Sequence, residues 1–435
     1  MVALAYVCVP VPVHPRTPPS KARSKGLSYP SYETLTALLE QISEDYPDIC
    51  HLESAGQSVQ GRELWWVRLS DHASVKEAEP SVTLIGSMHG DEPVGLALCL
   101  EMIRDLTENY GTDNRTTLLL NQTEIRIMPL MNPDGYEAQD RYNAHGADLN
   151  RNFPDASITV SDAFNTLAEL EPETQVLMAW TLDDSSTLSA NFHTGSLLVN
   201  YPLDYTLALS PDDALFQSIS LAYAMNNTDM YDHSFYENGI VRGAVWYEIY
   251  GSLQDWAYLG LGENHVTVEV STDKSPDADL LLNLWDSNRE SILAFMETVH
   301  TGIGGQIRDY DSNEPLKAWV SISDNDHLVF SHAQTGYFQR MLLPGTYDIT
   351  VGAPGYHSRT FEGQTVSENM TTRLDLTLEI APAEDLNGDF PSNWPVKNPG
   401  SIGDSPPSNQ TDDDPVDPIS SSDTSDTGCF IGILR

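Results

Sequence analysis

SVTLIGSMHGDE, residues 81–92, contains the clearest fold signal in this chain. It begins with a β-strand pattern, two glycines mark the loop that follows, and an apolar helical pattern starts at Val94. A strand, a loop and a helix in this order form the basic unit of open α/β sheets. Because ligands bind beyond the carboxyl ends of the strands in such sheets, His89 and Glu92 lie where a functional site is expected.

Strand and helix patterns alternate on both sides of this stretch. Predicted strands cover 64–69, 81–85 and 124–129, and predicted helices follow Ser31, a suitable N-cap, and begin at Val94. The alternation continues to about residue 300. It predicts an α/β domain over residues 26–300, with a mixed, largely parallel twisted sheet flanked by helices.

The pattern changes after Thr301. Short alternating strands such as 319–322 are separated by turn signals such as Pro344-Gly345, and no long helical pattern occurs. Residues 301–380 are therefore predicted to form a small all-β sandwich. The two ends of the chain are predicted to lie outside these domains, as a leader or flexible arm at 1–25 and an acidic disordered tail at 381–435.

The chain is strongly acidic, with a formal net charge of −42 from 64 acidic and 22 basic residues. Solubility is the simplest cause of this excess. Such a surface repels nucleic-acid phosphates, which argues against a nucleic-acid partner, and it attracts basic peptides. No apolar run approaches the roughly 20 residues of a transmembrane helix, so no membrane span is expected. We expect a monomer that is secreted, periplasmic or bound at the cell surface.

His89 and Glu92 are candidate metal ligands. An imidazole and a carboxylate three residues apart can bind one zinc ion, although such a pair by itself is more often a surface coincidence. His193, in LSANFHTG at 188–195, is the candidate third ligand because it also follows a strand-like run. The three together would form a catalytic zinc site with one position left for water.

A second group of polar residues lies between these ligands in the sequence. Arg141 and the segment DLNRNFPD, 148–155, supply guanidinium and amide donors that can bind a carboxylate, although a capped turn uses the same residue types. Glu269 lies in HVTVEVS, 265–271, a strand pattern of β-branched residues. Periodicity alone leaves open whether Glu269 faces solvent or a functional site.

Taken together, these segments resemble the M14 zinc metallocarboxypeptidases, and in particular the regulatory N/E branch that includes carboxypeptidases N, E, M and D. The resemblance covers about residues 26–380. In the family a transthyretin-like sandwich follows the catalytic domain, and GIGGQI at 302–307 and LLPGTY at 342–347 are similar to its characteristic segments. The resemblance implies an exopeptidase that acts on peptide or protein C-termini and binds one Zn²⁺ per catalytic domain.

The resemblance also implies roles for the residues near the metal. His89, Glu92 and His193 are similar to the zinc ligands of the family. Asp148 is similar to the carboxylate that orients the ligand His89, a role that metal sites commonly need. Glu269 is similar to the general base.

Further residues match the family's substrate contacts. Arg141, ten residues before Arg151 as in the N/E pattern, matches the arginine that polarises the scissile carbonyl and stabilises the oxyanion. Asn150 and Arg151 match the pair that binds the terminal carboxylate of the substrate. Tyr247 matches the mobile tyrosine that closes over the substrate.

Two residues imply a substrate preference. Asp204, eleven positions after His193, is similar to the acidic residue that pairs with a basic C-terminal side chain, and Gln254 is similar to the glutamine of the same pocket. The resemblance thus implies release of C-terminal Lys or Arg. Two other functions remain open: a related zinc amidohydrolase, such as an amino-acid deacylase or an enzyme that trims cell-wall peptides, and a catalytically silent binding protein.

Overall fold

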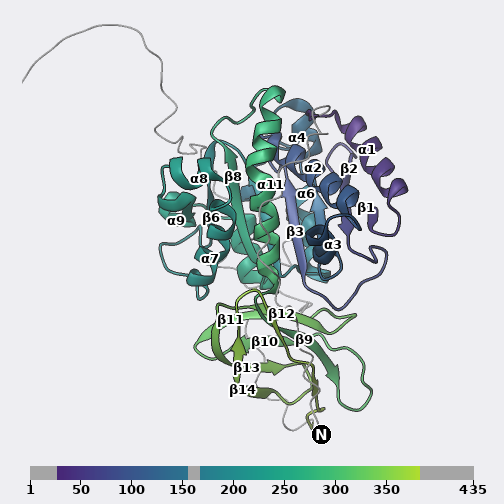
Figure 1. Ribbon diagram of the computed structural model, residues 1–435, viewed down its shortest axis with the longest axis vertical. Helices are drawn as coiled ribbons and strands as arrows, with labels where there is room; N and C mark the ends of the chain where they lie inside the picture. The colour runs from purple at the N-terminus through teal and green to yellow at the C-terminus, as the bar shows by residue number, and fades with distance from the viewer. Residues whose placement is uncertain (1–26, 155–166, 383–435) are drawn as a thin grey trace, which may run out of the picture.

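The computed structural model describes residues 27–154 and 167–382 of the chain. They form a helix-flanked sheet and an all-β part, which lie end to end along the long axis of the molecule (Figure 1). The predicted leader at 1–25 lies outside the described residues, and so does the predicted tail apart from its first two residues.

The first part is built on an eight-stranded sheet with the order β1-β2-β4-β3-β5-β8-β6-β7. Its strands are β1 (Cys50–Gln57), β2 (Glu63–Leu69), β3 (Ser81–Gly86), β4 (Glu124–Met128), β5 (Leu188–His193), β6 (Ser196–Tyr201), β7 (Ile240–Arg242) and β8 (Asn264–Ser271). The central strands β4, β3, β5 and β8 run parallel, whereas β1–β2, β2–β4 and β6–β8 pair antiparallel. A mixed sheet with a parallel centre was predicted, and it is confirmed.

Helices cover both faces of this sheet (Figure 1). They are α1 (Tyr32–Asp45), α2 (Val94–Asn109), α3 (Asn114–Leu120), α4 (Pro133–Ala138), α6 (Pro172–Asp183), α7 (Asp213–Ala224), α8 (Thr228–His233), α9 (Gly243–Trp246), α10 (Leu253–Trp256) and α11 (Leu281–Glu297). One apolar cluster joins Val82 and Leu84 of β3 to α2, α7 and α11, and a second joins Ile85 to α6 and α10. Successive strand residues point to opposite faces, so one strand contributes to both layers of the core.

Local sequence signals set the ends of several elements. Ser31 caps α1 as predicted, because its hydroxyl oxygen accepts the N–H of Thr34 at 3.3 Å. The strands predicted at 64–69, 81–85 and 124–129 are β2, β3 and β4. None of the helices in the described part of the chain is both long enough and apolar enough to cross a membrane.

The second part contains two small sheets. Its strands are β9 (Gly302–Asp309), β10 (Trp319–Ile322), β11 (Asn325–Phe330), β12 (Tyr337–Met341), β13 (Gly345–Gly352), β14 (Arg359–Val366), β15 (Thr371–Arg373) and β16 (Leu376–Leu378). One sheet has the order β11-β10-β13-β14, and in the other β12, β15 and β16 all pair with β9. Val320 and Ile349 of the first sheet share an apolar cluster with Ile303 and Phe338 of the second. The sheets therefore pack face to face, which confirms the predicted all-β sandwich.

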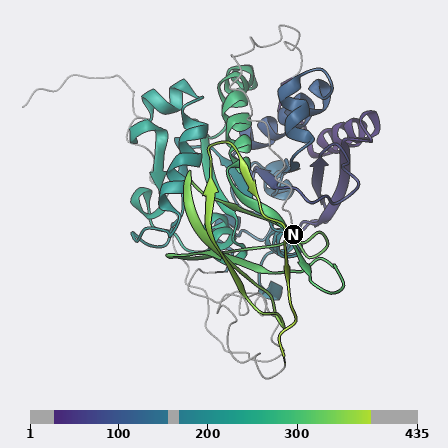
Figure 2. The same cartoon turned by 60° about the horizontal axis from the view of Figure 1, so that its bottom comes forward.

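The sandwich packs against the end of the α/β part that is at the bottom in Figure 1 and comes forward in Figure 2. Met341 of β12 is buried within the large apolar cluster of the α/β part. Next to it, Arg340 forms an ion pair with Asp212 at 2.8 Å, and both side chains are buried. The two parts are thus joined by apolar packing and by a buried ion pair.

Candidate active site

The loop after β3 positions two of the predicted metal ligands, His89 and Glu92. Between them lies Gly90, where a Cβ atom would come within 2.0 Å of the Gly135 carbonyl carbon. Only glycine allows the two backbones to come this close, and the loop therefore packs against the segment that carries Arg141. The N–H of Gly90 donates to the backbone oxygen of Arg141 at 3.4 Å. The glycine that marked a loop in the sequence therefore brings His89 and Arg141 to the same place.

Strand pairing positions the next two predicted residues. His193 ends β5, and the parallel register of β5 and β8 places it directly beside Glu269. Glu269 therefore faces the site rather than solvent, the alternative that the sequence left open, and only 7 % of its surface is exposed.

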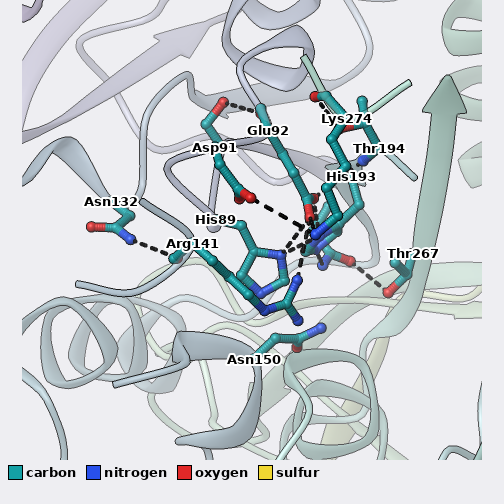
Figure 3. A network of polar contacts seen from close by, with 12 residues as sticks. His89, Asp91, Glu92, Asn132, Arg141, Asn150, His193, Thr194, Thr267 and Lys274 are labelled. Atoms are coloured by element: carbon teal, nitrogen blue, oxygen red, sulfur yellow. Dashed lines mark hydrogen bonds and ion pairs between the residues drawn. The ribbon is translucent and has the colours of Figure 1, made fainter. Parts of the chain in front are cut away.

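His89, Glu92 and His193 converge at the carboxyl ends of β3 and β5 (Figure 3). The Nδ1 atoms of the two histidines lie 3.0 Å apart. Glu92 Oε2 lies 2.9 Å from His193 Nδ1, and Glu92 Oε1 lies 3.2 Å from His89 Nδ1. The three side chains are 2–3 % exposed.

This donor set fits a zinc ion. Two imidazoles and one carboxylate are the ligands of many catalytic zinc sites, and zinc bonds of about 2.1 Å require donors roughly 3.4 Å apart. All three donor atoms here lie within 4.8 Å of one another. Both histidines direct Nδ1 to the same point, so one small cation can contact all three residues.

Neighbouring side chains fix the two imidazoles. Asp148 Oδ1 lies 3.1 Å from His89 Nε2, the nitrogen on the side away from the other donors. The side-chain amide of Asn191 lies 2.7 Å from His193 Nε2. Such contacts set the orientation and the tautomer of a metal-binding histidine.

The carboxylates of the donor Glu92 and of its neighbour Asp148 are held ionised. Burial opposes ionisation, but the histidine pair holds the pKa of Glu92 well below its usual range. In the same way His89 and Arg141 outweigh burial and hold the pKa of Asp148 far below its usual range. Both carboxylates are therefore negatively charged at neutral pH, as a metal ligand and its supporting group must be.

Arg141 lies beside the metal donors. Its Nε and Nη2 atoms lie 3.1 and 3.0 Å from Asp148 Oδ2, and its Nη1 lies 3.4 Å from Glu92 Oε1. Figure 3 shows its guanidinium group next to His89 and above Asn150. A fixed cation at this place can stabilise negative charge that develops next to the metal.

The donors open into a cavity of about 260 Å³. Nine of the predicted residues line it: His89, Glu92, Arg141, Asn150, Arg151, His193, Asp204, Tyr247 and Glu269. The other two predicted residues each contact a residue that lines the cavity. Asp148 contacts His89, and Gln254 contacts Asp204.

Asn150 and Arg151 form a short 3-10 turn, η1 (Leu149–Arg151), which Asp148 caps by accepting the N–H of Asn150. The Oδ1 atom of Asn150 accepts the N–H of Leu253 at 3.0 Å, so the amide is turned with its oxygen toward α10. Both side chains line the cavity, where an amide donor beside a guanidinium can bind a carboxylate.

A buried carboxylate, Asp204, also lines the cavity, and it lies just after β6, eleven positions after His193. Gln254 Nε2 donates to Asp204 Oδ1 at 2.6 Å and to Asn200 Oδ1 at 2.7 Å. A Cβ atom at Gly243 would lie 2.3 Å from Asp204 Oδ1, so glycine keeps the space beside the carboxylate open. Burial raises the pKa of Asp204 to about 6, while hydrogen bonds from Ser252 and Gln254 act in the opposite direction.

Sequence reasoning did not identify two further residues of this site. Asn191 contacts His193, and it could have been found because residues two apart on a strand point to the same face. Lys274 lines the cavity with its Nζ 3.6 Å from Glu92 Oε1, and it lies in a loop without a recognisable pattern.

Family models match both parts of the chain. The model described as zinc carboxypeptidase matches residues 35–291, more than half of the chain, and the model described as carboxypeptidase regulatory-like domain matches residues 302–379.

Curated relatives extend over both parts. Human carboxypeptidase D is 38 % identical over 382 residues, which cover 82 % of this chain and 27 % of that protein. Carboxypeptidase SOL1 of Arabidopsis thaliana is 36 % identical over 79 % of this chain and 70 % of its own length. The carboxypeptidase N catalytic chain of Mus musculus is 35 % identical over 76 % of this chain and 81 % of its own length. The chain therefore spans about a quarter of carboxypeptidase D but most of the other two.

Solved structures show the same fold for the first part. Thrombin-activatable fibrinolysis inhibitor is 22 % identical with a TM-score of 0.53, over 62 % of this chain and 74 % of that chain. Carboxypeptidase A from Helicoverpa armigera is 21 % identical with a TM-score of 0.53, over 62 % of this chain and 73 % of that chain. Because family models match both parts of the chain and the relatives extend over both, the chain belongs to the M14 zinc carboxypeptidase family, in its regulatory N/E branch.

Proposed function

We propose that this protein is a zinc-dependent carboxypeptidase that releases C-terminal Lys or Arg from peptides and proteins. One observation carries the proposal. A single cavity is lined by three convergent metal donors, by the carboxylate-binding types Asn150 and Arg151, and by the buried carboxylate of Asp204. A substrate in it would meet a metal at its scissile bond, donors at its terminal carboxylate and an anion at its side chain.

In this proposal His89, Glu92 and His193 hold one Zn²⁺. A bound zinc ion supplies Lewis acidity, which lowers the pKa of a coordinated water to about 7. Glu269, next to His193, accepts the proton of the attacking water and then protonates the leaving amine. Arg141 donates to the oxyanion of the tetrahedral intermediate, and Asp148 keeps both Arg141 and His89 in place.

The remaining lining residues select the end of a chain. Asn150, Arg151 and Tyr247 would bind the terminal carboxylate, and an internal peptide bond has no such group to compensate the Arg151 charge. Asp204 would pair with the guanidinium or ammonium group of the last residue, and Gln254 holds its carboxylate in position.

The broader organisation is part of the same proposal. Residues 26–300 would be the catalytic domain and 301–380 a transthyretin-like domain. We expect a monomer that acts outside the cytoplasm, either secreted or at the periplasm or cell surface, on basic C-termini and not on nucleic acid.

The test is release of the last residue from matched peptides that end in Arg, Lys, Leu, Phe or Glu, with and without a zinc chelator. Fast release of Arg and Lys that the chelator abolishes would support the proposal. Chelator-sensitive release of Leu or Phe instead would contradict the basic preference. Turnover of N-acylamino acids or of cell-wall peptides alone would indicate the related amidohydrolase. Zinc binding without any turnover would indicate a binding protein.

A further inference from the structure

The segment 202–212, which we call the β6–α7 segment, connects β6 to α7 and carries Asp204 near its start and Asp212 at its end. Its middle is open to solvent, with Leu207 and Leu209 each 65 % exposed. The position of Asp204 must therefore be set by what holds the two ends of the segment.

The catalytic part holds the first end. The N–H of Asp204 donates to both carboxylate oxygens of Asp255, at 3.0 and 2.9 Å, and the N–H of Tyr205 donates to Asp255 Oδ2 at 3.1 Å. Asp255 lies on α10 beside Gln254, whose amide donates to the Asp204 carboxylate. Two neighbouring residues of one short helix thus fix both the backbone and the side chain of Asp204.

The β-sandwich holds the other end. Arg340 Nη2 and Asn325 Nδ2 each donate to Asp212 Oδ1 at 2.8 Å. These residues lie on β12 and β11, more than a hundred positions after Asp212 in the chain. The hydroxyl group of Tyr258 donates to Asp212 Oδ2 at 3.0 Å.

Tyr258 connects the two ends. It lies in the helical turn η4 (Ala257–Leu261), which continues directly from α10, so it follows Gln254 by one helical turn. The sandwich also contacts it, because the ring of His327 stacks on the Tyr258 ring with centroids 4.0 Å apart. A displacement of Tyr258 would therefore move the helix that fixes Asp204.

Burial makes the ion pair of Arg340 and Asp212 a strong constraint. Arg340 is fully buried, and its Nε and Nη1 atoms have no hydrogen-bond partner among the described residues. Burial lowers the pKa of His327 to about 3, so this neighbour is neutral and Arg340 supplies the charge that compensates Asp212. A buried cation with one partner cannot shift without losing that partner.

We propose that the β-sandwich positions the carboxylate that selects the substrate. Arg340, with Asn325 and His327, fixes Asp212 and Tyr258 and thereby holds Asp204 at the depth where a basic side chain can reach it. Arg340 is a positioning residue, since it does not line the described cavity. This inference rests on the proposed function, in which Asp204 binds a C-terminal Lys or Arg.

The test compares Arg340→Met with Gln339→Met, its neighbour on the same strand. Gln339 is also buried at the junction, where its amide donates to the Val299 oxygen and to Thr371 Oγ1, and no contact joins it to the described β6–α7 segment. Two quantities are measured in each variant: kcat/KM for peptides that end in Arg or Leu, and hydrogen exchange at the Asp204 and Tyr205 amides. Arg340→Lys serves as the rescue variant.

In Arg340→Met we expect the Arg-over-Leu ratio of kcat/KM to fall roughly tenfold, through KM of the Arg peptide, and the two amides to exchange faster. Gln339→Met should leave both quantities unchanged, and Arg340→Lys should restore part of the ratio. If Arg340→Met lowers kcat/KM equally for both peptides, the inference is wrong and the sandwich is only a support. The same holds if the ratio and the exchange rates in Arg340→Met equal those in Gln339→Met.

If Arg340→Met does not fold, Asn325→Ala replaces it, because this change removes a donor to Asp212 without leaving a buried charge. The Arg-over-Leu ratio and the amide exchange of Asn325→Ala then decide whether the inference holds. If the unmodified protein releases no basic residue, the proposed function fails. Hydrogen exchange then still decides whether the sandwich holds the β6–α7 segment, because that measurement needs no substrate.

Discussion

Two groups of residues at the active-site cavity both contain buried carboxylates, but the charge is balanced in opposite ways. We call the metal donors with their supporting residues the metal end, and Asp204 with Gln254 the specificity end. At the metal end, two imidazoles outweigh burial and hold the pKa of Glu92 well below its usual range, and His89 and Arg141 do the same for Asp148. At the specificity end, Asp204 contacts the neutral amide of Gln254, and burial raises its pKa to about 6.

The two ends differ in when their charges are compensated. The metal end has its counter-charges in place before a substrate arrives, so its geometry is fixed in advance of the reaction. Asp204 keeps a charge that its own contacts compensate only in part, and a substrate cation would complete the compensation. Changes at the metal end should therefore affect every substrate alike, whereas changes at Asp204 should affect only basic ones.

The largest effect is expected for Glu269→Gln. The amide has the shape of the carboxylate but cannot accept the proton of the attacking water, so kcat should fall about 10²–10⁴-fold for Arg and Leu peptides alike. Steady-state kinetics on the two peptides measures this, with bound zinc quantified as the control. A variant that lost turnover on the Arg peptide alone would contradict the separation of the two ends.

Asp148→Asn should weaken the metal end by a smaller factor. It removes the negative charge that contacts both His89 and Arg141, so zinc affinity should fall about 10- to 100-fold. Competition with a chelator of known affinity measures the change. At saturating zinc the Arg-over-Leu ratio should stay that of the unmodified protein, and a shifted ratio would show that the two ends are coupled.

Asp204→Asn tests the other end. The neutral amide keeps the shape and loses the charge, so kcat/KM for the Arg peptide should fall about 10- to 100-fold, the range for one hydrogen bond to a charged group. The Leu peptide should be processed as before, and bound zinc should not change. Equal losses on both peptides would assign Asp204 to the structure of the cavity rather than to selection.

The metal end could be predicted from the sequence because its signals are local. The strand, loop and helix around His89 and the cap at Ser31 depend on residues close in the chain, and β3, α2 and α1 formed where expected. Periodicity also indicated the strand of His193. It could not give the parallel register that sets Glu269 beside His193, because strand pairing joins segments 76 residues apart.

The specificity end was predicted less completely, for the same reason. Gln254 was expected in the pocket of Asp204 by resemblance alone, and no local pattern indicated that its amide donates to both Asp204 and Asn200. The ion pair of Asp212 with Arg340 crosses 128 positions, and neither residue lies in a motif. Contacts of this kind depend on how the α/β part and the β-sandwich pack together, which local propensity does not encode.

The smallest expected effect is a pH dependence that separates the two ends without a substitution. The pKa of Asp204 is about 6, so the carboxylate is charged above that pH and becomes neutral as the pH falls through it. Burial raises this pKa above its usual value, whereas hydrogen bonds from Ser252 and Gln254 and the charge of Arg151 lower it. The Arg-over-Leu ratio of kcat/KM should therefore decrease about tenfold between pH 7 and pH 5, and it should level off at the ratio of a neutral side chain.

The ratio is the quantity to measure, because it removes what the peptides have in common. A loss of activity at the metal end at low pH would lower kcat/KM for both peptides, so it would cancel in the ratio. In Asp204→Asn the ratio should be low and independent of pH from 5 to 8, so the variant is the matched control. A ratio that stayed constant between pH 5 and 7 in the unmodified protein would mean that Asp204 is already compensated within the free protein, and the contrast between the two ends would be lost.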